Sequence, residues 1–168
     1  MSYSLNVYIK WLPSNDLNDK IVSFFETYGL NILIHPEFEL FDQSGFLPVV
    51  FEKNSKLLKK RFNFNILTGF ELYIDNVEKD ELEGLPLMKI FSHSITLRIC
   101  DPVIEFLCSK IFAAALVYIF DGFLIDTYSG DTFSKNDLKK YLKNAIKVFK
   151  SDIKTIESER IHEFKEWL

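Results

Sequence analysis

Histidine, cysteine and glycine, the residues that build most metal and phosphate sites, are scarce in this chain. Its 168 residues include three histidines, two cysteines and six glycines. No histidine has a second histidine or a cysteine at the spacing of zinc ligands, which argues against a zinc site. The glycines all stand alone, so no loop brings several backbone N–H groups together around a phosphate. The sequence therefore predicts no metal and no cofactor.

Cysteine usage also bears on catalysis and on the compartment. With two cysteines and no C-x-x-C motif, no disulfide framework is indicated, which favours a reducing compartment. Cys108 falls in an apolar helical stretch, where a buried thiol is inert. The carboxylate of Asp101 beside Cys100 would raise the pKa of that thiol, the wrong direction for a nucleophile. We expect neither cysteine to be catalytic.

The chain also lacks a long uncharged hydrophobic run. The longest one spans 111–120, ten residues, whereas a membrane span needs about 18–20. The first residues show neither the basic segment nor the apolar core of a secretory signal. The net charge of −4 is mild and has the wrong sign for nucleic-acid binding. We expect a cytoplasmic protein with no membrane and no nucleic-acid partner.

Alternating hydrophobic residues indicate the strands of one domain spanning residues 1–168. Such runs occur around 5–11, 30–34, 46–52, 62–66, 70–74, 95–99 and 123–126. Pro48 favours an edge position for its strand. Gly69 separates two of the runs, either as a turn or as a bulge in one long bent strand. The prediction is an α/β (α+β) fold with a central mixed sheet of about five to six strands, of unknown order.

Three helices accompany these strands. The residues over 15–28 have apolar side chains at helical spacing, and this helix joins two strands by a right-handed crossover or a split arrangement. The segment 103–120 is Ala-rich and apolar nearly all round, so it should be buried, with Asp101 and Pro102 marking its start. The segment 135–154 has one apolar stripe and a lysine coat. A further helical piece is predicted over 158–168.

Carboxylates are the one plentiful group with catalytic chemistry. They gather at two places in the sequence, one with Asp121, Asp126 and Asp131, the other with Glu37, Glu39 and Asp42. Either group could supply a glycosidase pair or hold a divalent ion. Aspartate beside glycine in a turn, however, is usually held there by local hydrogen bonds. A small carboxylate- or metal-dependent hydrolase using the first group remains the alternative function.

Charge is sorted into blocks along the chain. Basic residues are concentrated at 53–61 and 135–154, and acidic residues at 71–83. The lysine-coated helix could meet nucleic-acid phosphates, although a solvated outer face explains it equally. The acidic block is either a solvated loop after a strand or a docking surface for a basic partner, because concentrated charge speeds encounter. Its acids are Glu71, Asp75, Glu78, Asp80, Glu81 and Glu83.

Several segments within 66–134 carry a family resemblance. They are the run Thr68-Gly-Phe-Glu71, the run Ser94 to Asp101, the helix with Ala113 to Leu116, and Asp121 to Asp126 followed by Ser129-Gly-Asp131. In this order they resemble small bacterial immunity proteins of polymorphic-toxin and contact-dependent growth inhibition systems. The resemblance implies a cytoplasmic, non-catalytic protein that binds and blocks one cognate toxin domain, with a nuclease as the expected toxin. It transfers no contact residue by motif.

Charge complementarity then supplies the expected contact surface. A nuclease toxin carries a cationic face for its substrate, and we expect its inhibitor to present clustered carboxylates that are complementary to this face. The expected toxin-binding residues are the six acids of the 71–83 block, with lower weight on Asp126 and Asp131. The partner is expected to be basic, and the protein itself a monomer or a weak dimer.

Overall fold

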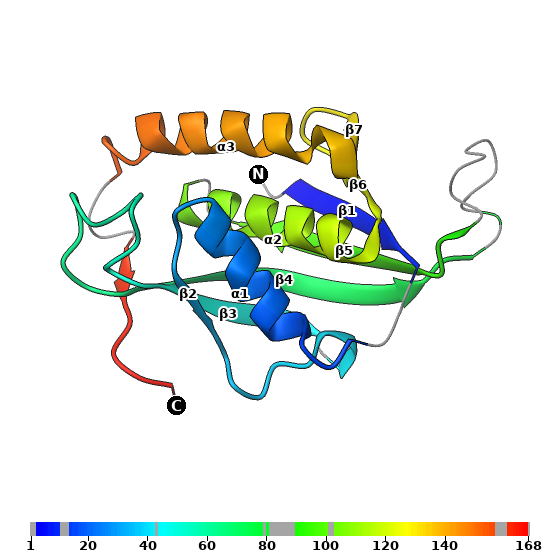
Figure 1. Ribbon diagram of the computed structural model, residues 1–168, viewed down its shortest axis with the longest axis horizontal. Helices are drawn as coiled ribbons and strands as arrows, with labels where there is room; N and C mark the ends of the chain where they lie inside the picture. The colour runs from blue at the N-terminus through cyan, green and yellow to red at the C-terminus, as the bar shows by residue number, and fades with distance from the viewer. Residues whose placement is uncertain are drawn as a thin grey trace.

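The computed structural model describes residues 3–10, 14–42, 44–78, 80, 90–100, 103–156 and 161–167. One β-sheet forms the base of the molecule and three helices pack on one of its faces (Figure 1). The strands are β1 (Tyr3–Ile9), β2 (Ile32–Ile34), β3 (Gly45–Phe51), β4 (Ile66–Asn76), β5 (His93–Ile99), β6 (Phe123–Asp126), β7 (Asp131–Ser134) and β8 (His162–Glu163). The helices are α1 (Leu17–Thr27), α2 (Ile104–Phe120) and α3 (Leu138–Asp152).

The sheet has the order β2-β3-β4-β5-β1-β6-β7, and β8 pairs with β4 outside this path. Every pairing in it is antiparallel. The α/β class is confirmed, but the predicted mixed sheet of five to six strands is wrong in both number and kind. Two of the extra strands, β7 and β8, have only four and two residues, too few for alternation to show. Three strands separate β1 from β2, so the first helix joins them by the split arrangement rather than as neighbours.

Gly69 and Pro48 face each other where β3 and β4 pair. Residue 69 lies inside one long strand, but the register with β3 is unbroken there, so Gly69 forms neither the turn nor the bulge that was expected. A Cβ at this position would collide with the carbonyl oxygen of Leu47, which explains why glycine stands there. The edge position predicted for this strand is wrong, because β2 lies outside β3 in the sheet. Pro48 itself lies beyond the three residues of β3 that pair with β2, where a strand tolerates proline.

Helix α2 lies against the middle of the sheet, where it contacts β1, β4, β5 and β6. Nearly all its residues are buried, as its apolar sequence predicts, and Ala113 to Ala115 are fully so. Alanine has no bulk beyond Cβ, which allows the helix to approach its neighbours closely. Asp121 ends the helix in the left-handed conformation, with φ of 50°. The predicted start at Asp101 and Pro102 lies outside the described residues.

Helices α1 and α3 flank α2 and complete the helical layer. Each buries one apolar stripe, which in α3 includes Leu138, Leu142 and Phe149. Before α3, the Asp137 carboxylate accepts hydrogen bonds from the backbone N–H and the hydroxyl of Ser134, both at 2.8 Å. The lysine-coated helix predicted over 135–154 is therefore confirmed in its main part.

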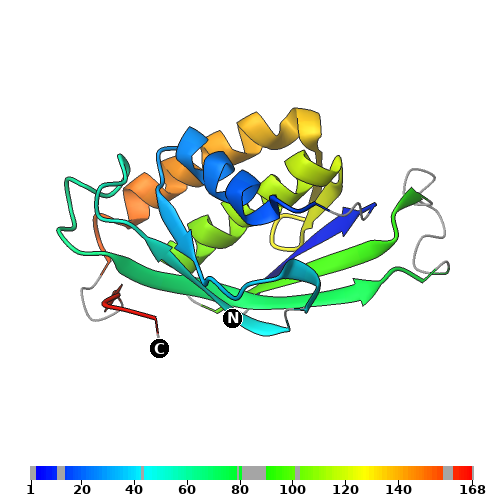
Figure 2. The same cartoon turned by 60° about the horizontal axis from the view of Figure 1, so that its bottom comes forward.

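The C-terminal segment 161–167 lies on the other side of the sheet from the helices (Figure 2). It forms β8 against Ile66 and Leu67 and then places Trp167 beside His35, with ring centroids 5.0 Å apart. The helix predicted over 158–168 is thus wrong for these residues. Ile161, Phe164 and Trp167 recur every third residue, which resembles a helical stripe. The start of β4 lacks β5 as a partner and pairs with this segment instead.

Candidate functional site

One face of the sheet carries none of the three helices, and we call it the open face (Figure 2). Its central part is built by alternate residues of β4, β5 and β1, because side chains of a strand alternate between the two faces. In register across these strands lie the rows Glu71–Arg98–Ser4, Tyr73–Thr96–Asn6 and Asp75–Ser94–Tyr8. These side chains are polar or amphipathic, whereas the alternate positions Leu72, Leu97 and Val7 are fully buried under the helices.

A hollow of about 770 Å³ lies on the open face. It is lined by Asn6, Tyr8, Asp75, Asn76, Glu78, Ser94 and Thr96. Hydroxyl and amide groups form its floor, while the two carboxylates come from the end of β4 and the residues that follow it. The hollow therefore offers hydrogen-bond acceptors and negative charge to a partner.

The acids of the 71–83 block fall into two environments. Glu71 is engaged on the sheet, because its Oε2 lies 3.7 Å from Nη1 of Arg98 and accepts a hydrogen bond of 3.2 Å from the Tyr73 hydroxyl. Partial burial and this carboxylate raise the pKa of Tyr73 above its ordinary value, which keeps the hydroxyl protonated as a donor.

The other described acids of the block are exposed. Asp75, Glu78 and Asp80 lie at and beyond the end of β4, and within the described residues no lysine, arginine or histidine nitrogen is within 4 Å of their carboxylates. Glu81 and Glu83 lie outside the described residues. Three of the six predicted acids, Asp75, Glu78 and Asp80, therefore form an exposed negative edge beside the hollow. Glu71 instead contacts Arg98 and Tyr73 on the sheet.

Asp126 does not belong to this surface, and we remove it from the expected toxin-binding residues. It is 1% exposed and its Oδ2 lies 2.8 Å from Nζ of Lys110, in the interior between α2 and α3. The Tyr141 hydroxyl donates to the same oxygen at 3.1 Å, and the backbone N–H of Tyr128 donates to Oδ1 at 3.0 Å. Asp131 is exposed on β7, which forms the edge of the sheet at the opposite end from β2. It stands apart from the acidic edge of β4.

The ammonium of Lys110 is enclosed by aromatic rings as well as by its carboxylate. Its Nζ lies 4.4 Å from the ring centre of Phe106 and 4.8 Å from that of Tyr141. Burial and the nearby Asp126 carboxylate raise the pKa of Tyr141 and of Tyr3 above the ordinary value. Sequence reasoning missed this ion pair, but it left a signal. Lys110 is the lone cation of an apolar helix and Asp126 the lone charge of a buried strand, and buried charges are normally paired.

Of the three carboxylates of the alternative hydrolase, Asp126 and Asp131 are register partners across β6 and β7 and line one hollow of about 660 Å³, whereas Asp121 does not line it. Asp121 caps the end of α2 and precedes β6, while Asp126 ends β6, so the length of a strand separates them. Asp126 is already neutralised by Lys110. Among the residues that the structure describes, no group of three His, Cys, Asp or Glu side chains could hold a metal ion. The same search covers Glu37, Glu39 and Asp42.

The remaining candidates can be placed briefly. Burial raises the pKa of the Cys108 thiol well above its ordinary value, which keeps it uncharged, and Cys100 is exposed. No helix within the described ranges is long and apolar enough to cross a membrane. In comparisons with known proteins, no family model, no curated protein and no solved structure matches this chain.

Proposed function

We propose that this protein is an immunity protein, which binds a cognate bacterial toxin domain through its open face and thereby neutralises it. The observation that supports this most is the hollow of about 770 Å³ on the helix-free face, edged by the Asp75 and Glu78 carboxylates. The family resemblance of residues 66–134 points to the same role. On this proposal the protein is cytoplasmic, acts in a stoichiometric complex and catalyses no reaction.

The charge of the hollow indicates the chemistry of the partner. Exposed carboxylates attract a basic surface at long range, which raises the association rate and rejects acidic competitors. Hydroxyl and amide groups on the floor, including Thr96 and Asn6, then offer short-range hydrogen bonds once the partner has docked. We infer a basic toxin domain, with a nuclease as the class that such a surface fits best.

A charge-reversal experiment with a matched control tests the acidic edge. The candidate toxin domain is taken from the reading frame directly upstream, and association is followed by stopped-flow fluorescence at about 50 mM and 500 mM salt, where charge screening differs strongly. The test variant is Asp75→Lys/Glu78→Lys. The control is Glu26→Lys/Asp152→Lys, two exposed acids of α1 and α3 on the helical layer, which changes the net charge equally.

We expect the test variant to associate at least tenfold more slowly at low salt, since steering accounts for one to three orders of magnitude in such rates. The difference should shrink at high salt, and the control should stay within about twofold of the unmodified protein. Equal slowing by both variants would show that only net charge matters, and would remove the open face from the proposal. Failure of the unmodified protein to bind or to restore growth against the toxin would contradict the function itself.

A further inference from the structure

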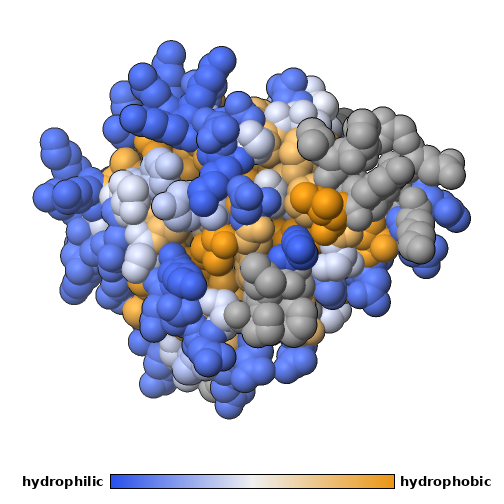
Figure 3. All heavy atoms as spheres, turned by 45° about the vertical axis from the view of Figure 1, so that its right-hand side comes forward, coloured by the Kyte–Doolittle hydropathy of each residue, from blue (hydrophilic) through white to orange (hydrophobic). Residues whose placement is uncertain are grey.

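A second hollow lies on the helical layer, on the opposite side of the sheet from the open face. Helices α1 and α3 both pack against α2, and near the C-terminal end of α2 the space between them is open. Figure 3, turned so that the right-hand side of Figure 1 comes forward, shows hydrophobic residues exposed among hydrophilic ones on the surface. The hollow has a volume of about 780 Å³, within the range of about 300–1,000 Å³ that is typical of small-molecule sites.

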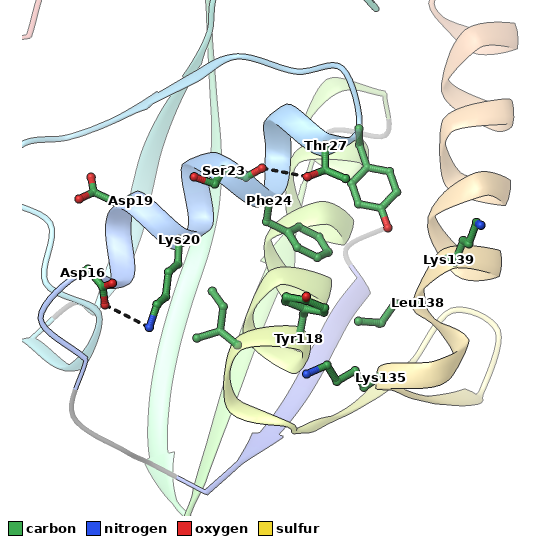
Figure 4. A pocket seen from close by; sticks show the side chains of 12 residues that line it. Asp16, Asp19, Lys20, Ser23, Phe24, Thr27, Tyr118, Lys135, Leu138 and Lys139 are labelled. Carbon is green, nitrogen blue, oxygen red and sulfur yellow. Dashed lines mark hydrogen bonds and ion pairs between the residues drawn. The ribbon is translucent and has the colours of Figure 1, made fainter.

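Aromatic rings form the centre of this groove (Figure 4). The Phe24 ring lies between those of Tyr28 and Tyr118, with centroid distances of 5.3 and 5.5 Å. Tyr118 is 51% exposed although it belongs to the most buried helix of the fold. A half-exposed aromatic cluster of this kind presents ring faces and edges on which a flat apolar body can stack.

The groove is positively charged on the side of α3. Nζ of Lys135 lies 4.4 Å from the ring centre of Tyr118, and Lys139 follows one turn later on the same wall. Neither lysine has a carboxylate oxygen within 4 Å in the described part of the chain. On the α1 side, Asp16 pairs with Lys20 at 3.1 Å, and the Asp19 carboxylate points away from Tyr118 (Figure 4). Two cations therefore line the α3 side of the groove, and no ion pair among the described residues engages either of them.

We propose that this groove binds a small aromatic anion, whose ring stacks on Phe24 and Tyr118 and whose acid group meets Lys135 and Lys139. Lys135 already lies over the Tyr118 ring and Lys139 lines the same groove, so a bound acid group would replace water around the two ammonium groups while the ring covers exposed apolar surface. Burial and the neighbouring Tyr118 raise the pKa of Tyr28, which keeps its hydroxyl available as a donor at the rim. The inference does not depend on toxin binding, because the open face is on the other side of the sheet.

Two fluorescent probes that differ only in charge separate the two parts of this proposal. One is 8-anilinonaphthalene-1-sulfonate, and the other is N-phenyl-1-naphthylamine, the same ring system without the sulfonate. Both are titrated into the unmodified protein, into Tyr118→Ala and into Lys135→Gln/Lys139→Gln. The matched control is Lys143→Gln/Lys147→Gln, two exposed lysines of α3 that do not line the groove. Backbone amide shifts of the unmodified protein show where each probe sits.

We expect the sulfonate probe to bind more tightly than the neutral probe, with shifts around residues 24, 28 and 118. Loss of the two groove lysines should weaken the sulfonate probe roughly fivefold and leave the neutral probe unchanged, while the control binds like the unmodified protein. Tyr118→Ala should weaken both probes by about tenfold. Equal binding of the two probes, equal loss in the control, or shifts elsewhere would each overturn the proposal. The mapping of amide shifts uses the unmodified protein, so the proposal can be refuted even if one of the variants folds poorly.

Discussion

Replacing Lys110 with methionine probes the buried ion pair between α2 and β6. Methionine keeps an unbranched apolar stem of similar length but removes the ammonium that lies 2.8 Å from Oδ2 of Asp126. The carboxylate then remains in the interior with hydrogen bonds from the Tyr141 hydroxyl and the Tyr128 backbone only. A charge that has lost its partner in this way destabilises the folded state.

The size of the effect follows from the burial of the pair. Removing one partner of a buried pair costs about 3–5 kcal/mol, and because 11% of the lysine side chain stays exposed we expect about 3 kcal/mol. That corresponds to a fall in Tm of about 6–12 °C for a domain of this size. The double variant Lys110→Met/Asp126→Asn should regain at least half of the loss, since a neutral amide needs no cation and still accepts from Tyr128.

Urea unfolding followed by circular dichroism measures these free energies of unfolding. Lys143→Met, an exposed lysine of α3, serves as the control and should stay within about 0.5 kcal/mol of the unmodified protein. The reasoning fails if Lys110→Met costs less than about 1 kcal/mol, or if the losses at positions 110 and 126 simply add in the double variant.

Four further substitutions test local contacts, each measured by thermal or urea unfolding. Gly69→Ala should destabilise the protein by about 1–3 kcal/mol, because the new Cβ collides with the carbonyl oxygen of Leu47; an unchanged stability would refute the close approach. Tyr141→Phe should cost about 1–2 kcal/mol through the lost bond to the buried carboxylate. Tyr3→Phe should leave the free energy of unfolding unchanged, since the buried Tyr3 hydroxyl has no hydrogen-bond partner within the described chain. Equal losses of stability in Tyr3→Phe and Tyr141→Phe would contradict this reasoning. The Ser134 hydrogen bonds lower the pKa of Asp137 below 3.8, so its contribution is present above that pH and disappears as the pH falls through the lowered value. Asp137→Asn should therefore lose less stability than the unmodified protein on acidification, and parallel curves would refute it.

The parts of the fold that were predictable are those in which one face or one helix is buried throughout. β1 and β5 alternate cleanly because the helices cover one side of them, and α2 is apolar all round because sheet and helices enclose it. Strand order was not predictable, since it depends on pairings between residues far apart, such as β1 with β5. The C-terminal strand was missed because two residues carry no alternation, and its partner is an unoccupied stretch of β4.

The candidate site was predictable in its composition but not in its placement. Charge density along 71–83 indicated an acidic surface, and the structure places Asp75 and Glu78 at the edge of the open face. The same reasoning put lower weight on Asp126 than on Asp75 but kept both, because both occur toward the end of a strand of alternating pattern. Only the structure shows that Asp75 faces solvent and that Asp126 forms an ion pair with Lys110. Likewise, the aromatic groove joins α1, which ends at residue 27, to α2 and α3, which begin only at residues 104 and 138.

The measurement that tests the central claim most directly is the affinity for the toxin domain after one bulky substitution in the floor of the open face. Thr96→Trp fills the hollow from the middle of β5, and Asn144→Trp places the same ring on the exposed side of α3. If the open face is the binding surface, calorimetry should show at least a tenfold loss of affinity for Thr96→Trp, as expected at the centre of an interface, and less than twofold for Asn144→Trp. Unchanged affinity of a folded Thr96→Trp protein would contradict the account.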